Sequence, residues 1–338
     1  MKILSIDTSC DETSAAVTYD TKILSNAIWS QASAHAKFGG VMPSLAQRMH
    51  EERIDFVIKK ALGKFTIEKD IDAIAVTIGP GLSIALGVGI DKANELSTKY
   101  NKKLIAVNHL EGHILSTLSN KSLDIKFPAL GLVLSGKNTQ IIQIDKIGKY
   151  KILAETQDDA LGEALDKAAR MLGLGYPGGA IFEKMAKLGD PKKYSLPVPL
   201  AGQEKRMIFS YSGLKTAMMK LVKSEEPLTK QKIYDLAASF QNVAFQHITR
   251  VLRFIISNLE FGFSDLLVGG GVAANVEVRK RLRKIGREFN IDVHFPYSKK
   301  LYGDNAAMIG IAANFKYQRG EFTKPDKIDR DPRAKLSS

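Results

Sequence analysis

Short apolar runs that end on polar or glycine residues recur along the chain and predict buried strands separated by helices. The first three runs follow one another closely, as in a meander, and the later ones alternate with helical patterns. In chain order, the first third is predicted to form strands at residues 2–7, 15–19 and 22–29, a helix at about 43–62, a strand at 71–78, a helix ending at 96 and a strand at 104–107.

The same order of elements returns in the rest of the chain. Three strands are predicted at residues 129–134, 140–145 and 149–155, followed by helices at about 161–172, 180–188, 214–222 and 229–258. A strand at 265–268, a helix at about 273–285, a strand at 291–295 and a helix at 304–316 complete the pattern. This repeat predicts a duplicated α/β domain with a cleft between the copies.

The repeat sets the expected domain limits. We expect an N-terminal lobe at residues 1–108, a C-terminal lobe with helical insertions at 109–302, and a helix at about 303–320 that packs back on the first lobe. Residues 321–338 form a charged tail that we expect to be mobile. A hydroxyl-rich turn joins the first two strands of each lobe, and the glycine turn at 79–83 leads into a helix. Both kinds of turn can bind an anion through backbone N–H groups, and the glycine turn is alternatively a place for close backbone approach.

Two histidines form the candidate metal site. His109 and His113 lie four residues apart at the start of an amphipathic segment, and on a helix this spacing places two imidazoles on one face, about 5–6 Å apart at Cβ. Both rings can then reach one divalent ion. Glu111 lies roughly 200° round the helix from each histidine, which disfavours a metalloprotease. The alternative is a pair of ordinary histidines at helical spacing, and a metal site needs a third ligand from elsewhere.

The charge of the chain favours a polyanionic partner. Lys and Arg number 49 against 36 acidic residues, giving a formal charge of +13, and nucleic acid is the usual partner of such a surface. The alternative is a Lys-rich protein without such a partner. A single cysteine, Cys10, excludes an intramolecular disulfide and suits the cytoplasm. No apolar run is long enough to span a bilayer, so we expect a soluble, cytoplasmic protein with no membrane contact.

Nine motifs, in order over nearly the whole chain, resemble the tRNA threonylcarbamoyladenosine transferases (TsaD type, once called glycoproteases). The Phe-Ser-Tyr-Ser-Gly-Leu-Lys motif is similar to the bacterial and organellar branch of this family. The motifs are Asp7-Thr8-Ser9-Cys10-Asp11-Glu12-Thr13, Gly79-Pro80-Gly81-Leu82, His109-Leu110-Glu111-Gly112-His113, Ser135-Gly136, Gly162-Glu163-Ala164-Leu165-Asp166-Lys167, Tyr176-Pro177-Gly178-Gly179, Phe209-Ser210-Tyr211-Ser212-Gly213-Leu214-Lys215, Gly270-Gly271-Val272-Ala273-Ala274-Asn275 and Asp304-Asn305-Ala306-Ala307.

The resemblance implies a fold, a reaction and a metal. The fold is that of actin, Hsp70 and the sugar kinases, with two ribonuclease H-like lobes around a central cleft. The reaction passes the threonylcarbamoyl group of threonylcarbamoyl-AMP to the exocyclic amine of the adenosine just 3′ of the anticodon, in tRNAs reading ANN codons. The metal is one divalent ion per subunit, iron(II) by expectation with zinc as the alternative, held by His109, His113 and Asp304. Without the histidines, Asp304 alone would be interpreted as a helix N-cap.

The resemblance also assigns residues to the donor. The positions that would bind the adenylate are Val133, Leu134, Ser135, Gly136, Lys137, Asp166, Gly179, Glu183 and Asn275. Each has a structural alternative: a surface acid for Asp166, a plain turn for Gly179, and a helix cap for Asn275. Lys137 stands where the family usually has glycine, which restricts φ. It either pairs with the phosphate or crowds the nucleotide.

Three residues near the N-terminus are the catalytic candidates implied by the resemblance. Ser9, Asp11 and Glu12 would lie opposite the metal, with Asp11 orienting or deprotonating the amine and Glu12 supporting it. The alternative is that both acids are solvated turn residues.

The resemblance also implies partner molecules, and it leaves two alternative functions to consider. Bacterial relatives work with tRNA, an inactive paralogue of the same fold and a small P-loop ATPase, whereas organellar relatives can act alone. The rival functions are an ATPase or kinase of the same fold, which does not require the two histidines, and a non-catalytic scaffold, which would be expected to lack the metal ligands. The cationic run at residues 279–284 could meet tRNA phosphates, although a solvated helix face is the simpler interpretation.

Overall fold

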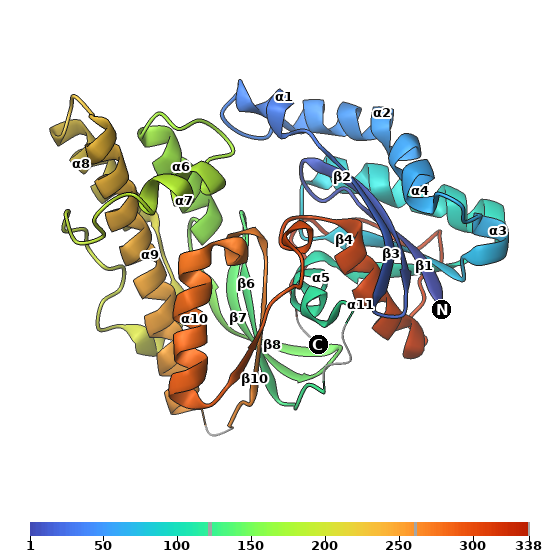
Figure 1. The fold of residues 1–338 in the computed structure, drawn as a ribbon. Coiled ribbons are helices and arrows are strands. Elements are labelled where there is room, and N and C mark those ends of the chain that lie inside the picture. The colour runs from blue at the N-terminus through green and yellow to red at the C-terminus, as the bar shows by residue number, and fades with distance from the viewer. Residues whose placement is uncertain (121–123, 260–261, 337–338) are drawn as a thin grey trace. The chain divides into compact units, whose positions relative to one another are not determined.

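The computed structural model describes residues 1–120, 124–259 and 262–336, which group into two compact units (Figure 1). Unit 1 comprises Met1–Ile125, Lys146–Tyr150 and Phe295–Ser338, and unit 2 comprises Lys126–Asp145 and Lys151–His294. The lobe limits expected from the sequence stay a prediction, since a compact unit is a group of contacts and not an independently folding domain. In the described parts of the chain, no helix combines the length and the apolarity needed to cross a membrane.

Unit 1 is built on a five-stranded sheet with the order β3-β2-β1-β4-β5. The pairs β1–β2 and β2–β3 are antiparallel, and the pairs β1–β4 and β4–β5 are parallel. Its strands are β1 (Lys2–Asp7), β2 (Glu12–Tyr19), β3 (Lys22–Ser30), β4 (Ala73–Gly79) and β5 (Lys103–Asn108). Its helices are α1 (Ala32–Ala36), α2 (Pro43–Leu62), α3 (Ile67–Asp70), α4 (Ser83–Tyr100), α5 (His109–Leu115), α11 (Ala306–Gln318) and the short 3₁₀ turns η1 (Ser116–Leu118) and η4 (Lys299–Leu301).

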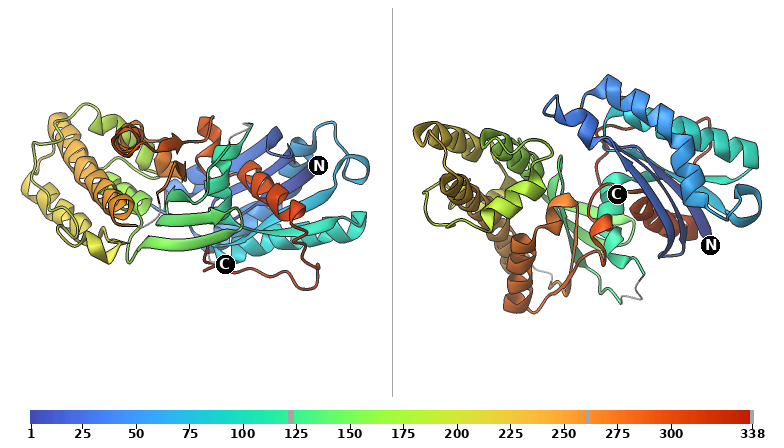
Figure 2. Two further views of the ribbon diagram at one scale, coloured as in Figure 1. Left: turned by 90° about the horizontal axis from the view of Figure 1, so that it is seen from below. Right: turned by 45° about the horizontal axis from the view of Figure 1, so that its top comes forward.

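The sheet of unit 1 is covered on both faces, and the side chains of β1 alternate between them. Leu4 and Ile6 are buried in a cluster with residues of α2 and α4. Ser5 points to the opposite face, where its hydroxyl donates to the backbone oxygen of Ala306 at 2.6 Å. A Cβ at Gly310 would lie 2.9 Å from the Ser5 hydroxyl, so glycine allows α11 to approach the sheet. Figures 1 and 2 show α2 and α4 side by side on one face and α11 on the other.

Unit 2 repeats the topology of unit 1. Its six-stranded sheet has the order β11-β10-β6-β7-β8-β9, in which β6–β7 is antiparallel and β6–β10 and β10–β11 are parallel. The strands are β6 (Ala129–Leu134), β7 (Thr139–Lys146), β8 (Lys149–Thr156), β9 (Ile208–Phe209), β10 (Asp265–Gly269) and β11 (Asp292–His294). The helices are α6 (Leu161–Met171), α7 (Gly179–Ala186), α8 (Ser212–Ser224), α9 (Lys230–Asn258), α10 (Val276–Phe289) and the 3₁₀ turns η2 (Glu204–Arg206) and η3 (Gly271–Ala274).

The added helices of unit 2 gather around α9. Helices α6, α7, α8 and α10 all contact it, and the core between them contains the buried rings of Phe182 and Phe240, whose centroids lie 5.8 Å apart. Apart from β9 and these helices, β6, β7, β8, β10 and β11 take the places that β1 to β5 take in unit 1. The duplicated α/β pattern predicted from the sequence is therefore confirmed.

The charged tail, which we expected to be mobile, packs along unit 1. The N–H of Thr323 donates to the oxygen of Leu104 at 2.9 Å, and the N–H of Asp331 donates to the oxygen of Ile78 at 2.7 Å. Leu336 is only 2% exposed. Backbone hydrogen bonds to β4 and β5 thus hold residues that have few apolar side chains, and the sequence pattern carries no sign of such bonds. Residues 337–338 lie outside the described part of the chain.

Two predicted helix starts are wrong by a few residues because an asparagine begins each helix. Helix α11 begins at Ala306 and not at 304, with the Asn305 side chain accepting from the N–H of Met308 at 3.2 Å. The helix predicted from 273 is a 3₁₀ turn followed by α10, which begins at Val276 after Asn275. Asn is among the best N-cap residues.

Candidate metal centre and ligand-binding turns

The two histidines lie at the point where β5 passes into α5. The Asn108 side chain caps this helix by accepting from the N–H groups of Leu110 and Glu111 at 2.8 and 3.4 Å. This cap fixes the first turn, so that His109 and His113 share one face, with ring centroids 4.6 Å apart. Both are buried, His113 completely.

The third member of the cluster comes from the other end of unit 1. Asp304 lies just ahead of the capped start of α11, and its Oδ1 is 3.3 Å from Nε2 of His109 and 3.3 Å from Nε2 of His113. The helices α5 and α11 approach closely at Gly112, where a Cβ would lie 3.0 Å from Ile309 and 3.2 Å from Met308. The sequence prediction that two imidazoles and a distant carboxylate converge is consistent with this geometry.

Two acids beside the cluster have different roles. Asp7 is fully buried at the end of β1, and its Oδ1 lies 3.7 Å from Nδ1 of His109, on the side of the ring away from Asp304. Glu111 accepts instead from the Tyr150 hydroxyl at 2.8 Å and takes no part in the cluster, as the helical spacing predicted. Sequence reasoning missed Asp7 as a partner of His109. The only signal was an acid at the end of an apolar strand.

Charge and burial act against each other in this cluster. Burial lowers the pKa of the His109 ring, but the charges of Asp304 and Asp7 outweigh it and raise the pKa to about 10. Burial lowers the pKa of His113, and the charge on His109 adds to that effect. Burial acts to raise the pKa of the Asp304 carboxyl, yet the two imidazoles hold it well below its usual range. The metal-free cluster therefore carries a proton on His109 and a negative charge on Asp304.

The cluster fits a divalent metal ion. His109, His113 and Asp304 each offer one ligand atom, and these atoms lie within 4.8 Å of one another. Nε2 of His113 is buried and has no hydrogen-bond partner among the described residues, which an ion would supply. Two imidazoles and one carboxylate suit iron(II) and also zinc.

The catalytic candidates lie on the acidic turn (residues 8–12), which leads from the end of β1 into the first residue of β2 in the same unit. The Ser9 hydroxyl is buried without a hydrogen-bond partner among the described residues. Glu12 accepts from the Ser30 hydroxyl at 3.2 Å. Burial raises the pKa of Glu12 well above its usual value, and the charges of Asp11 and Asp304 add to the rise. Neighbouring negative charge thus favours the protonated form of Glu12.

The glycine turn after β4 meets the backbone of the acidic turn. A Cβ at Gly81 would lie 2.6 Å from the backbone oxygen of Ser9, so only glycine lets the two turns meet. The N–H of Leu82 donates to that Ser9 oxygen at 2.8 Å, and the N–H of Gly81 donates to the oxygen of Pro332 at 3.3 Å. The structure thus shows a close backbone approach, which was one of the two uses predicted for residues 79–83.

The adenylate candidates all lie in unit 2, around the end of β6. Val133 and Leu134 are buried strand residues, and Ser135 closes the following turn by accepting from the N–H of Asn138 at 3.0 Å. Two glycines allow neighbouring segments to approach. A Cβ at Gly162 would lie 2.6 Å from the Ser135 oxygen, and one at Gly270, where φ is +95°, would lie 2.4 Å from the Leu134 oxygen.

Lys137 fits its turn without strain. It is exposed, and it is not among the residues with a positive φ. A Cβ at the preceding Gly136 would meet nothing within 4 Å. The missing glycine thus costs no backbone strain, and the Lys137 ammonium adds a positive charge beside the turn.

Asp166 and Gly179 are joined by a turn ahead of α7. Oδ1 of Asp166 accepts from the N–H groups of Gly178 and Gly179, both at 2.9 Å. The close approach occurs at Gly178, where a Cβ would lie 2.3 Å from Cβ of Ala169, while one at Gly179 would lie no nearer than 3.7 Å to Asp166. One oxygen of Asp166 therefore holds the turn.

Glu183 and Asn275 both bond to the start of α10. Oε1 of Glu183 accepts from the N–H of Val276 at 3.0 Å. The Asn275 side chain accepts from the N–H groups of Glu277 and Val278 and donates to Gln241 at 2.8 Å. Asn275 is thus a helix cap, which was the structural alternative weighed from the sequence.

Comparison with known sequences identifies the family. A family model described as tRNA N6-adenosine threonylcarbamoyltransferase (TsaD) matches residues 22–311. A protein with this name from Bartonella tribocorum is 44% identical, with the alignment covering 98% of this chain and 94% of the relative. One from Gloeothece citriformis is 43% identical over 95% of this chain and 93% of the relative.

Comparison with solved structures confirms the expected fold class. Full-length HypF in its phosphate- and nucleotide-bound form has a TM-score of 0.60 at 14% identity, covering 95% of this chain and 56% of HypF. A ROK family glucokinase from Streptomyces griseus has a TM-score of 0.51 at 13% identity, covering 94% of this chain and all of the kinase. Likeness at such identities concerns the fold alone, which is the duplicated ribonuclease H-like fold of the sugar kinases. From the match over most of its length and the identity to these relatives, the chain belongs to the tRNA N6-adenosine threonylcarbamoyltransferase (TsaD) family.

Proposed function

We infer that the protein is a transferase that adds a threonylcarbamoyl group to tRNA adenosine. Relatives that share 43–44% of its residues over nearly the whole chain carry this name. The observation that carries the assignment is the convergence of His109 and His113 on α5 with Asp304, which lies just before α11 in unit 1. A non-catalytic scaffold would be expected to lack these ligands, and a kinase does not require them.

The donor in our proposal is threonylcarbamoyl-AMP, and the acceptor is the exocyclic amine of the adenosine just 3′ of the anticodon. The amine nitrogen forms a bond to the carbamoyl carbon, the bond from that carbon to the phosphate oxygen breaks, and AMP leaves. The proton of the amine passes to a base on the protein. Holding the amine against the carbonyl carbon accounts for much of the rate enhancement.

The metal ligands would be His109, His113 and Asp304, with iron(II) as the proposed ion and zinc as the alternative. Such an ion, when bound, supplies a Lewis acid that offsets negative charge on donor oxygens. Asp7 would hold the His109 ring in the orientation that points Nε2 toward the ion, as carboxylates commonly do for histidine ligands. The buried position of this pair keeps the orientation fixed.

The acidic turn would handle the amine. Burial and neighbouring negative charge raise the pKa of Glu12, so this side chain holds a proton more readily than an exposed glutamate and, when protonated, can donate a hydrogen bond. Asp11 is then the acceptor for the proton of the amine. The Ser9 hydroxyl, which is buried without a partner among the described residues, can bind the substrate.

Unit 2 would bind the adenylate. The turn at residues 133–137 presents small residues and the Lys137 ammonium to a phosphate, and Asp166, Gly179, Glu183 and Asn275 would line the nucleoside. An inactive paralogue of the same fold, a small P-loop ATPase and a cytoplasmic location belong to the same proposal.

The test combines purified protein, threonylcarbamoyl-AMP and unmodified tRNA, with and without the ATPase and the paralogue. Mass spectrometry of the digested tRNA measures the modified nucleoside. Asp304→Ala should lose the bound metal and about 10³-fold in rate, because a metal ion supplies several kcal/mol of charge stabilisation. His294→Gln is the matched control, since His294 bonds to Asp265 in unit 2 at 2.6 Å. A metal-free Asp304→Ala protein that retains full activity would contradict the proposal.

A further inference from the structure

A buried histidine on α2 contacts the acidic turn. His50 has no exposed surface, and its two ring nitrogens both bond to the segment that carries the catalytic candidates. Nδ1 lies 2.8 Å from the Thr13 hydroxyl, and Nε2 lies 3.0 Å from the backbone oxygen of Cys10. The ring thus joins the middle of a helix to both sides of Asp11 and Glu12.

The chemistry of the two partners fixes the tautomer. A backbone carbonyl can only accept, so Nε2 of His50 carries the hydrogen that is donated to Cys10. In a neutral ring Nδ1 is then an acceptor, and the Thr13 hydroxyl donates to it. Burial lowers the pKa of His50, which favours this neutral form. Both nitrogens are therefore occupied, and His50 is available neither as a metal ligand nor as a base.

Three successive carbonyls of the acidic turn are each held by a different segment. The Ser9 oxygen accepts from the N–H of Leu82 at 2.8 Å, and the Asp11 oxygen accepts from the N–H of Gln31 at 2.9 Å. The Cys10 oxygen between them accepts from His50. The two outer bonds are made by backbone donors, whereas the central one depends on a single side chain.

We propose that His50 is a positioning residue that fixes the backbone of the acidic turn and so the directions of the Asp11 and Glu12 carboxylates. The inference rests on the proposed function, in which these carboxylates handle the substrate amine. Without the bond to Cys10, the turn keeps its outer carbonyl bonds and its centre can shift. A misplacement of about 1 Å in a positioned group can cost about 10²-fold in rate.

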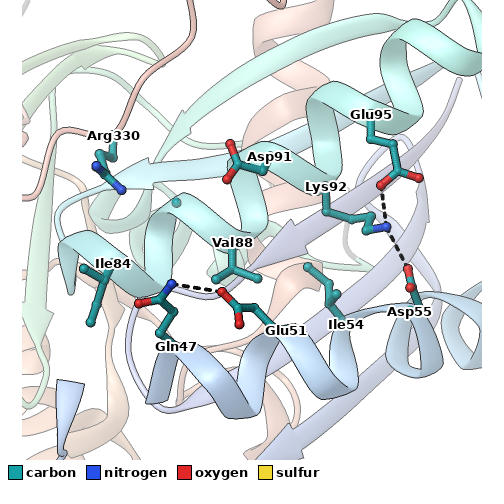
Figure 3. A pocket seen from close by; sticks show the side chains of 11 residues that line it. Gln47, Glu51, Ile54, Asp55, Ile84, Val88, Asp91, Lys92, Glu95 and Arg330 are labelled. Carbon is teal, nitrogen blue, oxygen red and sulfur yellow. Dashed lines mark hydrogen bonds and ion pairs between the residues drawn. The ribbon is translucent and has the colours of Figure 1, made fainter. Parts of the chain in front are cut away.

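A hydrogen bond within α2 offers a matched control. Gln47 and Glu51 lie one helical turn apart, and Gln47 donates to Glu51 at 2.9 Å. With Ile54 and residues of α4 they line a pocket of about 320 Å³ (Figure 3). Glu51→Ala removes a hydrogen bond from the same helix as His50 without touching the turn, so it reports any effect of a general change in α2.

The test uses two substitutions of His50, each of which can replace only one of the two ring nitrogens. The amide of Gln in His50→Gln reaches roughly the place of Nε2 and can donate to Cys10, whereas the shorter Asn in His50→Asn reaches only the place of Nδ1. We expect His50→Asn to lower kcat about 10–100-fold with KM for tRNA and metal content unchanged. His50→Gln and Glu51→Ala should stay close to the wild type. Equal losses in the Asn and Gln variants, or no loss in Asn, would overturn the proposal.

Hydrogen exchange gives a readout that does not depend on activity. A peptide covering residues 8–13 should exchange faster in His50→Asn than in the wild type and His50→Gln, and unchanged exchange in the Asn variant would overturn the proposal. If the wild-type protein transfers no threonylcarbamoyl group, the proposed function is wrong. Hydrogen exchange of this peptide then still tests whether His50 positions the acidic turn. If His50→Asn does not fold, His50→Leu replaces it, because leucine fills the buried place of the ring but has no donor for the Cys10 oxygen. The same peptide should then exchange faster, and unchanged exchange would again contradict the proposal.

Discussion

The first strands of the two units have the same place in their sheets but end on different residues. In unit 1, β1 ends on Asp7, which pairs with Ser14 across the hairpin. In unit 2, β6 ends on Leu134, which pairs with Thr139. Asp7 and Leu134 are both fully buried, yet one is a carboxylate beside His109 and the other is apolar.

The turns that follow these strands are packed in the same way. A glycine after β4 in unit 1 and one after β10 in unit 2 contact the end or turn of the first strand. Gly81 lies against the oxygen of Ser9, and Gly270 against the oxygen of Leu134. The duplicated fold therefore provides the same backbone path twice. The side chains at the strand ends then determine the chemistry of each site. Charged and imidazole groups lie there in unit 1, whereas backbone groups, amides and small side chains lie there in unit 2.

The largest expected difference between the units is the response of ligand binding to pH. The pKa of His109 is raised to about 10 in the metal-free protein, and a metal ion requires the neutral ring. Metal binding therefore releases a proton at every pH below about 10, and affinity rises with pH. We expect the association constant to grow about tenfold per pH unit between pH 6.5 and 9, roughly 300-fold in all.

Competition with a chelator of known affinity measures this slope for zinc. AMP provides the comparison, because no histidine lies among the residues proposed to bind it in unit 2, and its affinity should change little over the same range. A metal affinity that is flat with pH would show that His109 is already neutral. A steep slope for AMP would show that the contrast between the units is wrong.

The second prediction concerns the residue that differs at the end of the first strand. Asp7→Asn keeps the shape of the side chain but removes the charge that holds His109. We expect metal affinity to fall about 10–100-fold, the usual effect of losing a carboxylate that orients a histidine ligand. Equilibrium dialysis with metal analysis measures this.

Leu134→Ala is the matched change in unit 2. Removing a fully buried leucine should lower the free energy of unfolding by about 2–5 kcal/mol and leave metal affinity unchanged. A comparable loss of metal in both variants would mean that Asp7 acts only through the stability of unit 1.

Patterns along the chain predicted most of the fold. The apolar run of β6 and the helix α2 have the predicted bounds, since strand alternation and proline at a helix start are local signals. The prediction of a mobile tail was wrong, because the tail is held by backbone hydrogen bonds to strands that are distant in the sequence. The starts of α10 and α11 were misplaced because an asparagine cap overrides apolar periodicity.

The candidate site could be predicted in part. The four-residue spacing of His109 and His113 is a local signal, but only family resemblance pointed to Asp304, which follows them by nearly two hundred residues. The contacts of Asp7 and His50 were missed, since each depends on the meeting of segments far apart in the chain. The roles of the catalytic and adenylate residues stay predictions.

The smallest expected effect is that of removing a single helix cap, which can be compared between the two units. Asn108 begins α5 in unit 1 and Asn275 begins α10 in unit 2, and each accepts from two backbone N–H groups. Replacing either by Ala should lower the free energy of unfolding by about 1 kcal/mol, the usual value for such a cap. The two variants should therefore look alike in denaturant unfolding.

Metal retention should distinguish these two variants. Asn108 precedes His109 directly and also donates to the oxygen of Lys335 at 3.3 Å, so its loss frees the first turn of the metal-binding helix from the tail. Dissociation of zinc into excess chelator should be faster in Asn108→Ala than in the wild type, and unchanged in Asn275→Ala. Equal rates in the two variants would mean that α5 is held by its packing against α11 alone, and that the cap contributes stability to unit 1 without orienting its ligands.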